Sequence, residues 1–573
     1  MNDLKEYYRP SDQGLLRDIL LLVLIFAIPF FIHLGDIPLM DPDEGRYAEI
    51  PREMLERADF ITPTLNYVKY FEKPPLLYWL NAASIEIFGE NEFAVRFPSA
   101  LCGLLTVLAT YLIARRLYDR RTAMISSFIL GTSTGFLIQS RIILTDTLLT
   151  FCIVVSLGSF IVASKREGRR KSPLWLLFYF FSALAVLAKG LIGILLPGMI
   201  IFAYLLLTRK LDMLARMRIL PGILIFLAVS APWFVAVTMA NPEFPGFFFI
   251  HEHFQRFTSN VHSRYQPFWF FVPVLAVTML PWSFFIPGAL GRAWRNRNHE
   301  NGEAGLYLFL WFILVFLFFS VSVSKLVPYM LPVFPPLAIL IASRFSRAVD
   351  GRHDELIPAL LTLGLTLIAL GLAGVGYLFL PEITRFLSGI FPLQEKSLRH
   401  FQQNIPELSL MIFMTLGLNF LFQGIVVLAS FRNPVRMLAL ISICLYALEL
   451  SVVEMVMPVI ADKESRRGLA LKAKSAASAD SVIATFGLMQ GVSWYTGRRV
   501  LVTGKLDELE FGSRQGNQSA WFPDRQALLK AWGTATPMLI ILKKGELDDL
   551  LPDLHPSPRV LGESGRQVLI SNK

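Results

Sequence analysis

Long apolar segments separated by short polar ones run through most of this chain. A membrane-spanning helix needs about 20 mainly apolar residues, and the sequence offers about thirteen such segments. They lie near residues 17–35, 96–114, 122–140, 142–164, 174–189, 190–208, 219–240, 268–290, 305–324, 326–343, 356–380, 408–430 and 435–458. The pattern predicts a polytopic α-helical membrane protein. The first segment lacks a small-residue cleavage site, so we expect it to be retained as a span.

Basic residues gather in alternate loops between these segments. They occupy residues 5–17, 115–121, 165–171, 209–218, 292–297, 344–352 and 432–436. By the positive-inside rule these loops are cytoplasmic. The intervening loops therefore face outward, among them 36–95 and 241–267, and an odd number of spans places the tail after residue 458 on the same side. We expect a multi-pass protein of the cell inner membrane whose outward loops are periplasmic.

The composition agrees with this topology. Hydrophobic residues make up 54% of the chain and charged residues only 17%, as in membrane proteins. The formal net charge of +10 does not indicate nucleic-acid binding, because the basic residues follow the loop pattern. The three cysteines all lie inside apolar segments, which argues against a disulfide framework.

After Pro458 the composition changes to mixed charge and short apolar runs. Candidate strands lie at 481–486, 492–502, 537–542 and 566–571, and a helical pattern lies near 524–532. The sequence thus predicts two domains. Residues 1–458 form the transmembrane domain, and residues 459–573 form a small extracytoplasmic α/β domain.

The first outward loop, 36–95, carries the densest charge of the membrane part. Glu44 to Arg57 reads as a helix, because Pro42 and Asp43 provide a start signal and apolar residues recur on one face. We expect this helix to lie along the bilayer interface. Carboxylates and guanidinium groups at such a boundary are costly to desolvate and therefore suggest a function. The Lys73-Pro74-Pro75 sequence precedes a second helix, Leu76 to Ile87.

Asp43 is the candidate catalytic residue of this loop. A carboxylate at an apolar boundary can have its pKa raised into the range of a general base. The structural alternative is that Asp43 and Glu44 cap the helix. Tyr47 follows Asp43 by one helical turn and could orient a ligand on the same face. Its alternative is a tyrosine of the interfacial aromatic belt.

Lys73 is an outward cation that the positive-inside rule does not explain. Beside Glu72 and a double proline, it suits binding of a lipid-linked phosphate, and Arg256 on another outward loop is a second candidate. Either side chain could instead lie along the membrane interface with only its charged end in water.

Further polar residues stand at the outward ends of other spans. Asp146 is a candidate substrate-binding residue, with an Arg141–Asp146 structural pair as the alternative. Lys325 and Tyr329 place a cation and a phenol at another outward end. The remaining candidates are the polar residues His251 and His253. With Glu72 these histidines offer ligands of the kind zinc binds, but their spacing is a weak metal signal. No cofactor is assigned, and a divalent metal stays open.

No nucleotide-binding loop, dinucleotide fingerprint or common hydrolase motif occurs at a credible position. Five segments, DPDEGRYAEIPREML, YFEKPPLLYWL, SRIILTDTLLTF, EHFQRF and SKLVPYMLPVFPPLA, instead resemble the GT-C membrane glycosyltransferases that use polyprenyl-phosphate sugars. The similarity is greatest to bacterial lipid A aminoarabinose transferases and their protein O-mannosyltransferase relatives. It extends over about residues 15–345, and the residues after 459 carry no motif assignable to lipid A.

The resemblance implies roles for particular residues. The essential acid of the family's first outward loop corresponds to Asp43 and the following tyrosine to Tyr47. Phosphate or sugar contacts correspond to Lys73, Arg256 and Tyr329. The expected donor is an undecaprenyl-type polyprenyl-phosphate sugar and the expected acceptor is lipid A, with a protein hydroxyl or another glycan as the alternative. A transporter or flippase for a lipid-linked sugar is the alternative from another class, but it calls for related halves and a midplane site.

Overall fold

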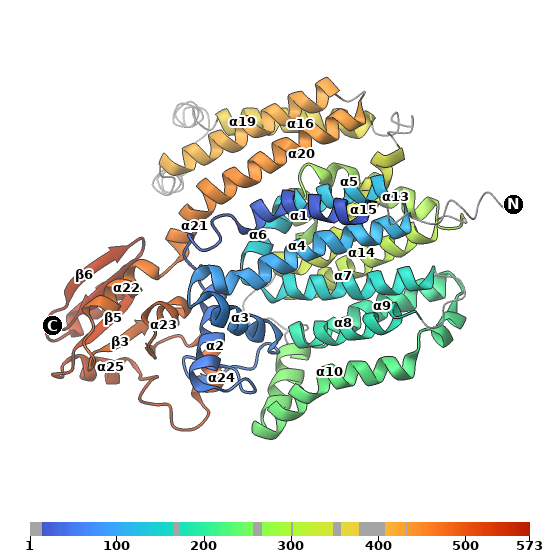
Figure 1. Ribbon diagram of the computed structural model, residues 1–573. Helices are drawn as coiled ribbons and strands as arrows, with labels where there is room; N and C mark the ends of the chain where they lie inside the picture. Colours follow the sequence, from blue (N-terminus) through green and yellow to red (C-terminus); the bar gives the residue numbers. More distant parts are fainter. Residues whose placement is uncertain are drawn as a thin grey trace.

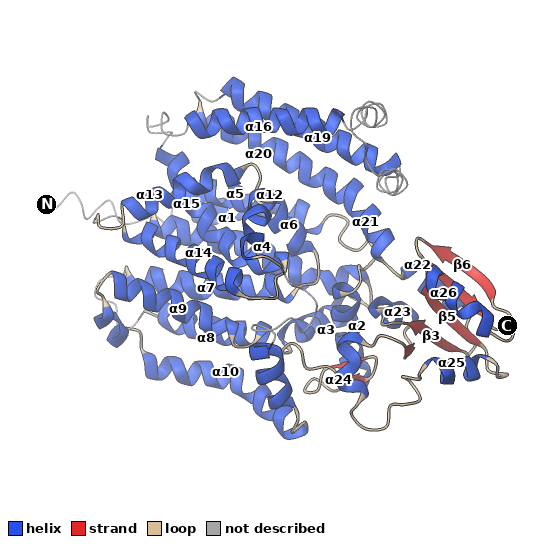
Figure 2. Cartoon of the chain, turned by 180° about the vertical axis from the view of Figure 1, so that it is seen from behind, coloured by secondary structure: helices blue, strands red, loops and turns tan. Residues whose placement is uncertain are grey.

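The computed structural model describes residues 14–165, 172–255, 266–299, 302–347, 357–376, 407–430 and 433–573. Long helices fill most of the molecule and run in roughly one direction, and a small sheet domain lies at one end of them (Figure 1). Seen from behind, the same two parts appear as a helical body and one compact group of strands (Figure 2).

The helical body consists mainly of the apolar segments that the sequence predicts. Its helices are α1 (Leu15–Phe31), α4 (Glu92–Leu117), α5 (Arg120–Gly131), α6 (Thr134–Arg141), α7 (Thr145–Ser164), α8 (Leu174–Lys189), α9 (Ile192–Leu207), η2 (Leu211–Arg216), α10 (Ile219–Ala240), η3 (Gly246–Gln255), η4 (Phe268–Phe270), α12 (Phe271–Thr278), η5 (Trp282–Phe285), α13 (Ile286–Arg295), α14 (Glu303–Val321), η6 (Val327–Val333), α15 (Phe334–Arg347), α16 (Ile357–Gly376), α19 (Glu407–Ser430), α20 (Pro434–Ser451), η10 (Val452–Val456) and α21 (Met457–Glu464).

Among the described residues, six helices are long and apolar enough to cross a membrane, or up to eight if each of two bent pairs counts as one span. Several shorter apolar helices, including α8 and α9, lie beside them. The predicted total of thirteen spans stays a prediction, since the predicted outward loop at 381–407 lies almost wholly outside the described residues.

Two of the predicted spans are broken rather than continuous. The segment predicted at 122–140 is the pair α5 and α6, bent by 62°, and the segment at 268–290 is bent by 116° between α12 and α13. Pro281 lies at the second bend and cannot donate a backbone hydrogen bond to continue a helix. Apolar composition predicts burial in the membrane, but it does not reveal such breaks.

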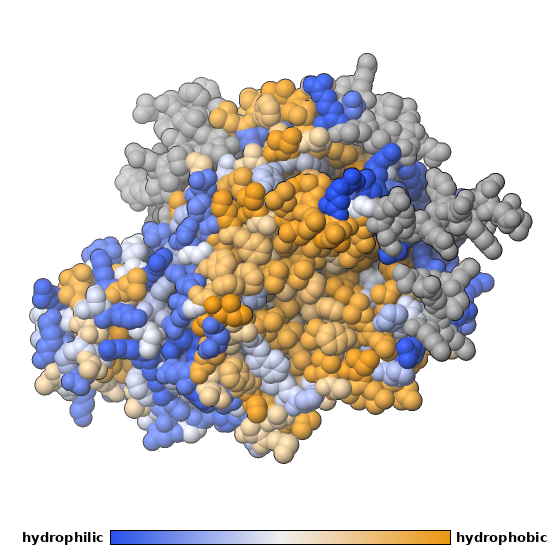
Figure 3. Space-filling model, viewed as in Figure 1, coloured by the Kyte–Doolittle hydropathy of each residue, from blue (hydrophilic) through white to orange (hydrophobic). Residues whose placement is uncertain are grey.

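The surface reflects this division. In the view of Figure 1, apolar residues cover the helical body in one broad field, whereas polar residues dominate the end that carries the sheet (Figure 3). Side chains such as Leu20, Leu24 and Leu224 point outward with more than half of their surface exposed. Exposed apolar faces of this extent are expected where lipid, not water, surrounds a protein.

The C-terminal domain contains a five-stranded sheet with the order β4-β3-β5-β7-β6. Its elements are α22 (Arg467–Ala476), β3 (Val482–Phe486), α23 (Gln490–Thr496), β4 (Leu501–Thr503), η11 (Asp507–Leu509), α24 (Glu510–Ser513), α25 (Arg525–Trp532), β5 (Met538–Lys543), α26 (Lys544–Leu550), η12 (Leu551–Asp553), β6 (Arg559–Ser564) and β7 (Gln567–Ser571). Strand β3 is parallel to β4 and β5, while β7 runs antiparallel to β5 and β6.

The sequence predicted most of these elements, but one strand is wrong. Within the predicted strand 492–502 the structure has helix α23 followed by the short strand β4. The segment is rich in aromatic and β-branched residues, which favours a strand locally. Gly497 ends the helix with φ of +65°, and every residue of α23 is buried. Tertiary packing therefore overrides the local preference. Strand β6 was not predicted.

The first outward segment, 36–95, lies between the two parts of the molecule. It contains α2 (Asp43–Arg57), a hairpin of β1 (Thr64–Leu65) and β2 (Val68–Lys69), and α3 (Leu76–Phe88). The two helices were predicted with nearly these bounds. All residues of α2 from Glu44 to Met54 are buried within the protein. The expected position of α2 along the bilayer interface stays a prediction. Helix α23 of the C-terminal domain packs against α2.

Candidate functional site

A cavity of about 360 Å³ lies where α2 and the segment before α3 meet α7, α8, α9, η3, α14 and η6. One part of its wall is charged and is lined by Asp43, Arg46, Glu72, Lys73, Asp146, Lys189 and Glu252. Another part is apolar and includes Leu191, Leu195 and Phe318. Leu195 is half exposed. The cavity therefore suits an amphipathic ligand with a charged head and an apolar tail.

Helix α2 places Asp43, Arg46 and Tyr47 along its first turn. Pro42 and not Asp43 is the N-cap, and no side chain caps the helix, so the capping alternative for Asp43 is wrong. The Arg46 guanidinium donates hydrogen bonds to the carboxylates of Asp43 and Glu508 and lies 4.6 Å from the centre of the Tyr47 ring. The Asp43 side chain remains 42% exposed, in contrast to its 4% exposed partner Arg46. Asp43 is thus held in place while its carboxylate stays accessible.

Glu44 has a structural role instead. Its carboxylate accepts two hydrogen bonds of 2.7 Å from Arg96 of α4 and others from the backbone amides of Met40 and Ile143. Both Glu44 and Arg96 are buried. Because such a bidentate pair is directional, it joins the start of α2 rigidly to the helical body. The adjacent acids Asp43 and Glu44 therefore differ in role: one faces the cavity and the other anchors the helix.

Lys73 and Glu72 follow the β1–β2 hairpin and line the same cavity. The Lys73 ammonium group donates a hydrogen bond of 2.8 Å to the backbone carbonyl of Glu72 and lies 3.7 Å from the Glu252 carboxylate of η3. Its side chain is 12% exposed and that of Glu252 only 2%. A lysine so enclosed is not an interfacial residue with its charged end in water, which was the alternative for Lys73.

Asp146 and Tyr329 complete the wall on the side of α7 and η6. Asp146 forms an ion pair with Lys189, whose ammonium group lies 4.4 Å from the centre of the Tyr329 ring. The predicted alternative, an Arg141–Asp146 pair, is wrong. Arg141 instead donates hydrogen bonds of 2.6 Å to the carbonyls of Pro29 and Ile32 at the end of α1.

Of the other predicted residues, some do not line the cavity and some lie outside the described residues. Lys325 is buried beside the cavity and donates hydrogen bonds to the backbone carbonyls of Gln266 and Ser322. The His251 ring stacks on Phe247 with centroids 5.0 Å apart, and its Nδ1 lies 3.4 Å from Glu252. The side chain of His253 and the whole of Arg256 lie outside the described part of the chain.

Sequence reasoning missed four side chains of this site: Arg46, Lys189, Glu252 and Glu508. Lys189 had a signal, as an outward lysine next to Gly190, and Arg46 stands one helical turn after Asp43. No sequence signal pointed to Glu508, because it reaches the site only through the contact between the C-terminal domain and α2. Among the described residues, no three or more His, Cys, Asp or Glu side chains are grouped as a metal ion would need.

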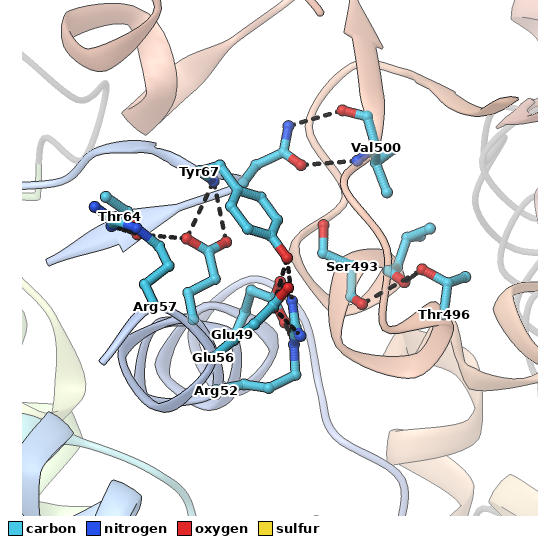
Figure 4. Close-up of polar contacts among 12 residues, drawn as sticks. Glu49, Arg52, Glu56, Arg57, Thr64, Tyr67, Ser493, Thr496 and Val500 are labelled. Atoms are coloured by element: carbon cyan, nitrogen blue, oxygen red, sulfur yellow. Dashed lines mark hydrogen bonds and ion pairs between the residues drawn. The ribbon is translucent and has the colours of Figure 1, made fainter. Parts of the chain in front are cut away.

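The C-terminal domain is attached to α2 and its hairpin by buried polar contacts. Within the first outward segment, Tyr67 of the hairpin donates to Glu53 and Glu56 of α2 (Figure 4). The neighbouring Asn66 side chain reaches the C-terminal domain and exchanges two 2.8 Å hydrogen bonds with the backbone of Val500. On the other side of α2, the backbone amide of Gly491 donates a 2.8 Å hydrogen bond to Asp41. These contacts fix the domain over the helix that carries Asp43.

Burial changes the acidity of several of these groups. Desolvation raises the pKa of Asp41 to about 7 and that of Glu53 to about 8, against opposing contributions from Arg466 and Thr64 respectively. Desolvation likewise raises the pKa of Glu508, although the Arg46 guanidinium acts to lower it. Burial raises the pKa of Tyr47, so its phenol stays protonated and can donate a hydrogen bond.

Comparisons with known proteins agree with this architecture. The profile of the dolichyl-phosphate-mannose-protein mannosyltransferase family matches residues 16–287, and that of the aminoarabinose transferase C-terminal domain matches residues 469–572. The structure superimposes on ArnT from Cupriavidus metallidurans bound to undecaprenyl phosphate with a TM-score of 0.82 and 26% identity, covering 97% of this chain and 98% of that one.

The curated sequence relatives are named as arabinosyl transferases that act with undecaprenyl phosphate-linked aminoarabinose. The undecaprenyl phosphate-α-4-amino-4-deoxy-L-arabinose arabinosyl transferase of Erwinia tasmaniensis is 36% identical over 329 residues, which are 57% of this chain and 59% of the relative. That of Pseudomonas aeruginosa is 36% identical over 367 residues, or 62% of this chain and 65% of the relative. The alignments thus span less than two thirds of these curated relatives.

The predicted fold class is confirmed by the near-complete structural match and by the apolar helices. The protein is a multi-pass membrane protein with a small C-terminal sheet domain. The predicted resemblance is confirmed as well, since matched profiles lie at both ends of the chain. In these two segments the chain is similar to protein O-mannosyltransferases and aminoarabinose transferases, and as a whole it has the fold of the GT-C membrane glycosyltransferase ArnT.

Proposed function

We propose that this protein transfers a sugar, 4-amino-4-deoxy-L-arabinose or a close relative, from undecaprenyl phosphate to lipid A. The observation that carries the proposal is the cavity that joins a charged wall around Asp43 and Lys73 to an apolar wall around Leu195. A polyprenyl-phosphate sugar has matching parts, namely a phosphate, a sugar and a long apolar chain. The names of the relatives support the donor, and the acceptor follows from the family resemblance.

In the proposed reaction the acceptor oxygen attacks the anomeric carbon of the sugar, and the bond from that carbon to the phosphate oxygen breaks. Lys73 stabilises the negative charge on the departing polyprenyl phosphate. Asp43 takes the proton of a hydroxyl acceptor, or orients the acceptor and the sugar if the acceptor is an ionised phosphate. Arg46 keeps the Asp43 carboxylate in position through its hydrogen bond.

The apolar wall supports sideways entry of the donor. Leu191 caps the start of α9 and Leu195 lies in its first turn, and both are substantially exposed. A lipid-linked donor can reach such an opening from within the bilayer. We place the site on the periplasmic face, because the loop 36–95 faces outward by charge alternation.

Mass analysis of lipid A and of periplasmic glycoproteins, in cells with and without the gene, tests the acceptor. The proposal expects a sugar on lipid A only in cells that carry the gene. A gene-dependent sugar on a protein or another glycan would replace lipid A as the acceptor, and no gene-dependent sugar anywhere would reject transfer. Repeating the purified reaction with a chelator tests whether a divalent metal takes part.

A further inference from the structure

The turn of the β1–β2 hairpin has a backbone conformation that needs support. Asn66 and Tyr67 form this two-residue turn, and their φ angles are +52° and +61°. This left-handed conformation is common for asparagine but costly for a tyrosine, so the surrounding structure must hold it. The chain leads from the hairpin directly to Lys73, which lines the candidate site. Support of the turn therefore affects the position of Lys73.

Glu53 of α2 provides part of this support and is fully buried. Its carboxyl group accepts a 2.5 Å hydrogen bond from the Thr64 hydroxyl (Figure 4). Each of its two oxygens also lies 3.1 Å from the backbone amide of Tyr67, which donates to both. Helix α2 carries Asp43 at its start. Glu53 thus connects the helix that places Asp43 with the hairpin that precedes Lys73.

The surroundings of Glu53 favour its protonated form. Glu49 and Glu53 stand one helical turn apart, are both fully buried and share a hydrogen bond. Two carboxyl groups can share a hydrogen bond only if one of them carries a proton. Arg52 donates hydrogen bonds of 2.7 and 2.8 Å to Glu49, so Glu49 is the ionised member. Among the described residues, no arginine or lysine forms an ion pair with Glu53, and Arg57 donates to the Thr64 hydroxyl instead.

Burial decides the charge of Glu53. It raises the pKa of this carboxyl group to about 8, and the charge of Glu49 acts in the same direction. The hydrogen bonds to Glu53 and the charge of Arg52 oppose the rise but do not cancel it. The other charged or titratable groups around the pair are Glu56 and Arg57 of α2, Tyr67 of the hairpin, Glu90 after α3 and Arg499 of the C-terminal domain.

We propose that Glu53 is a positioning residue whose proton holds the hairpin, and through it Lys73, in place for binding of the lipid donor. The protonated carboxyl group donates to Glu49 while it accepts from Thr64 and Tyr67. Loss of this proton leaves two carboxylates facing each other in a buried space, where they repel each other. The effect on the donor rests on the proposed function, whereas the effect on the hairpin does not.

The proton makes opening of the hairpin depend on pH. Opening exposes Glu53 to water and returns its pKa from about 8 toward the ordinary value of 4.5. Between these two values the open form has lost the proton that the closed form keeps. Each pH unit in this range therefore favours opening about tenfold, and the effect levels off above the higher value.

The first measurement is hydrogen–deuterium exchange of the hairpin, residues 64–69, in purified full-length protein between about pH 6 and about pH 9. Glu53→Gln is the key variant, because its amide still donates to Glu49 and accepts from Tyr67 but carries no titrating proton. The ratio of the exchange rates of the parent and this variant removes the effect of pH on exchange itself. We expect this ratio to rise with pH by up to about tenfold per unit and to level off above about pH 8.

Glu56→Gln is the matched control. Glu56 lies on the same helix and accepts a 2.6 Å hydrogen bond from the Tyr67 hydroxyl, but it is exposed and its hydrogen bonds lower its pKa. Its variant should keep the pH dependence of the parent.

The second measurement is the donor KM and kcat of the parent and of Glu53→Gln over the same pH range. The ratio of the two KM values should rise with pH as the exchange ratio does, while the ratio of the kcat values stays near one. A carboxyl group with only a structural role would lower stability in Glu53→Gln equally at every pH.

The proposal is overturned if the exchange ratio does not change with pH, if it changes without the KM ratio, or if Glu53→Gln fails to fold. The last outcome counts against it because the amide mimics the protonated carboxyl group. If the protein transfers no sugar, the proposed function fails, and the exchange ratio still decides whether the proton of Glu53 holds the hairpin.

Discussion

Glu508 of the C-terminal domain accepts a hydrogen bond from Arg46 of the candidate site, 462 positions earlier in the chain. The same guanidinium group donates to Asp43, so the C-terminal domain is connected to the proposed base through one side chain. Arg46 is 4% exposed and Glu508 10%, and the contact is therefore shielded from water. The C-terminal domain therefore helps to hold Arg46 and Asp43 in place in the cavity wall.

Because Glu508 holds Arg46, we expect a substitution in the C-terminal domain to slow sugar transfer. Glu508→Gln keeps the size of the side chain but removes the charge that holds Arg46. We expect turnover to fall about tenfold or more, since a hydrogen bond to a charged group contributes about 1.5–3 kcal/mol. Donor affinity should change little, because Glu508 does not line the cavity. Steady-state kinetics of the purified variant measure both quantities.

Glu510→Gln is the control for this experiment. Glu510 is exposed and pairs only locally with Arg514, so its replacement should leave kinetics unchanged. Partial recovery of turnover in Glu508→Asp would support a positioning role through charge. Equal kinetics for Glu508→Gln and the parent protein would mean that Arg46 does not need its partner.

Lys73→Ala should weaken binding of the lipid donor, because it removes the cation proposed to contact the phosphate. The loss of one charged hydrogen bond predicts an increase in the donor Kd of about tenfold or more. Lys69→Ala is a suitable comparison, since Lys69 lies on the nearby strand β2 but pairs with Glu243 and does not line the cavity. Equal donor affinity in both variants would contradict the assignment.

The topology predicts that Ser519→Cys and Glu90→Cys react with a membrane-impermeant thiol reagent from the periplasmic side. Both positions are exposed, whereas the three native cysteines are buried and should give little background. Asn66 is less suitable for labelling, because its side chain is buried and bonded to Val500. Reaction only after the membrane is ruptured would place these segments in the cytoplasm.

The raised pKa of Asp41 makes the stability of the folded protein depend on pH. Its pKa is raised from 3.8 to about 7 by burial in the folded protein. Between these values the unfolded carboxyl group has lost its proton and the folded one keeps it, so stability is full below the lower value and falls as the pH rises through the higher one. Asp41→Asn, which does not titrate, should flatten the thermal stability profile between about pH 4 and pH 7. An unchanged slope would contradict the burial effect.

Hydrophobic periodicity predicted much of the fold because it reports burial directly. Helix α2 begins at Asp43 as the Pro42-Asp43 signal indicates, and α3 begins after the double proline Pro74-Pro75. The sequence singled out Asp43, Lys73 and other polar residues of the cavity because the positive-inside rule does not explain charged residues in outward loops. Their common location follows from the spans, which bring their outward ends to one face.

Contacts between distant segments were beyond the reach of sequence patterns. The segment of α23 resembles a strand locally, and only its burial against α2 favours a helix. Arg141 and Asp146 are near in sequence and opposite in charge, yet Arg141 binds carbonyls of α1 and Asp146 binds Lys189 of α8. The pairing of Arg46 with Glu508 depends on how two domains meet, and neither local sequence carries that information.

The central claim is that the Asp43 carboxylate acts in transfer, and Asp43→Asn tests it most directly. Asparagine keeps the size of the side chain and can still accept a hydrogen bond from Arg46, so α2 should remain in place. A general base contributes about 10²–10⁴-fold to rate. With a polyprenyl-phosphate sugar and lipid A, the purified variant should bind donor normally and lose turnover by a factor in that range. Near-normal turnover would contradict the account.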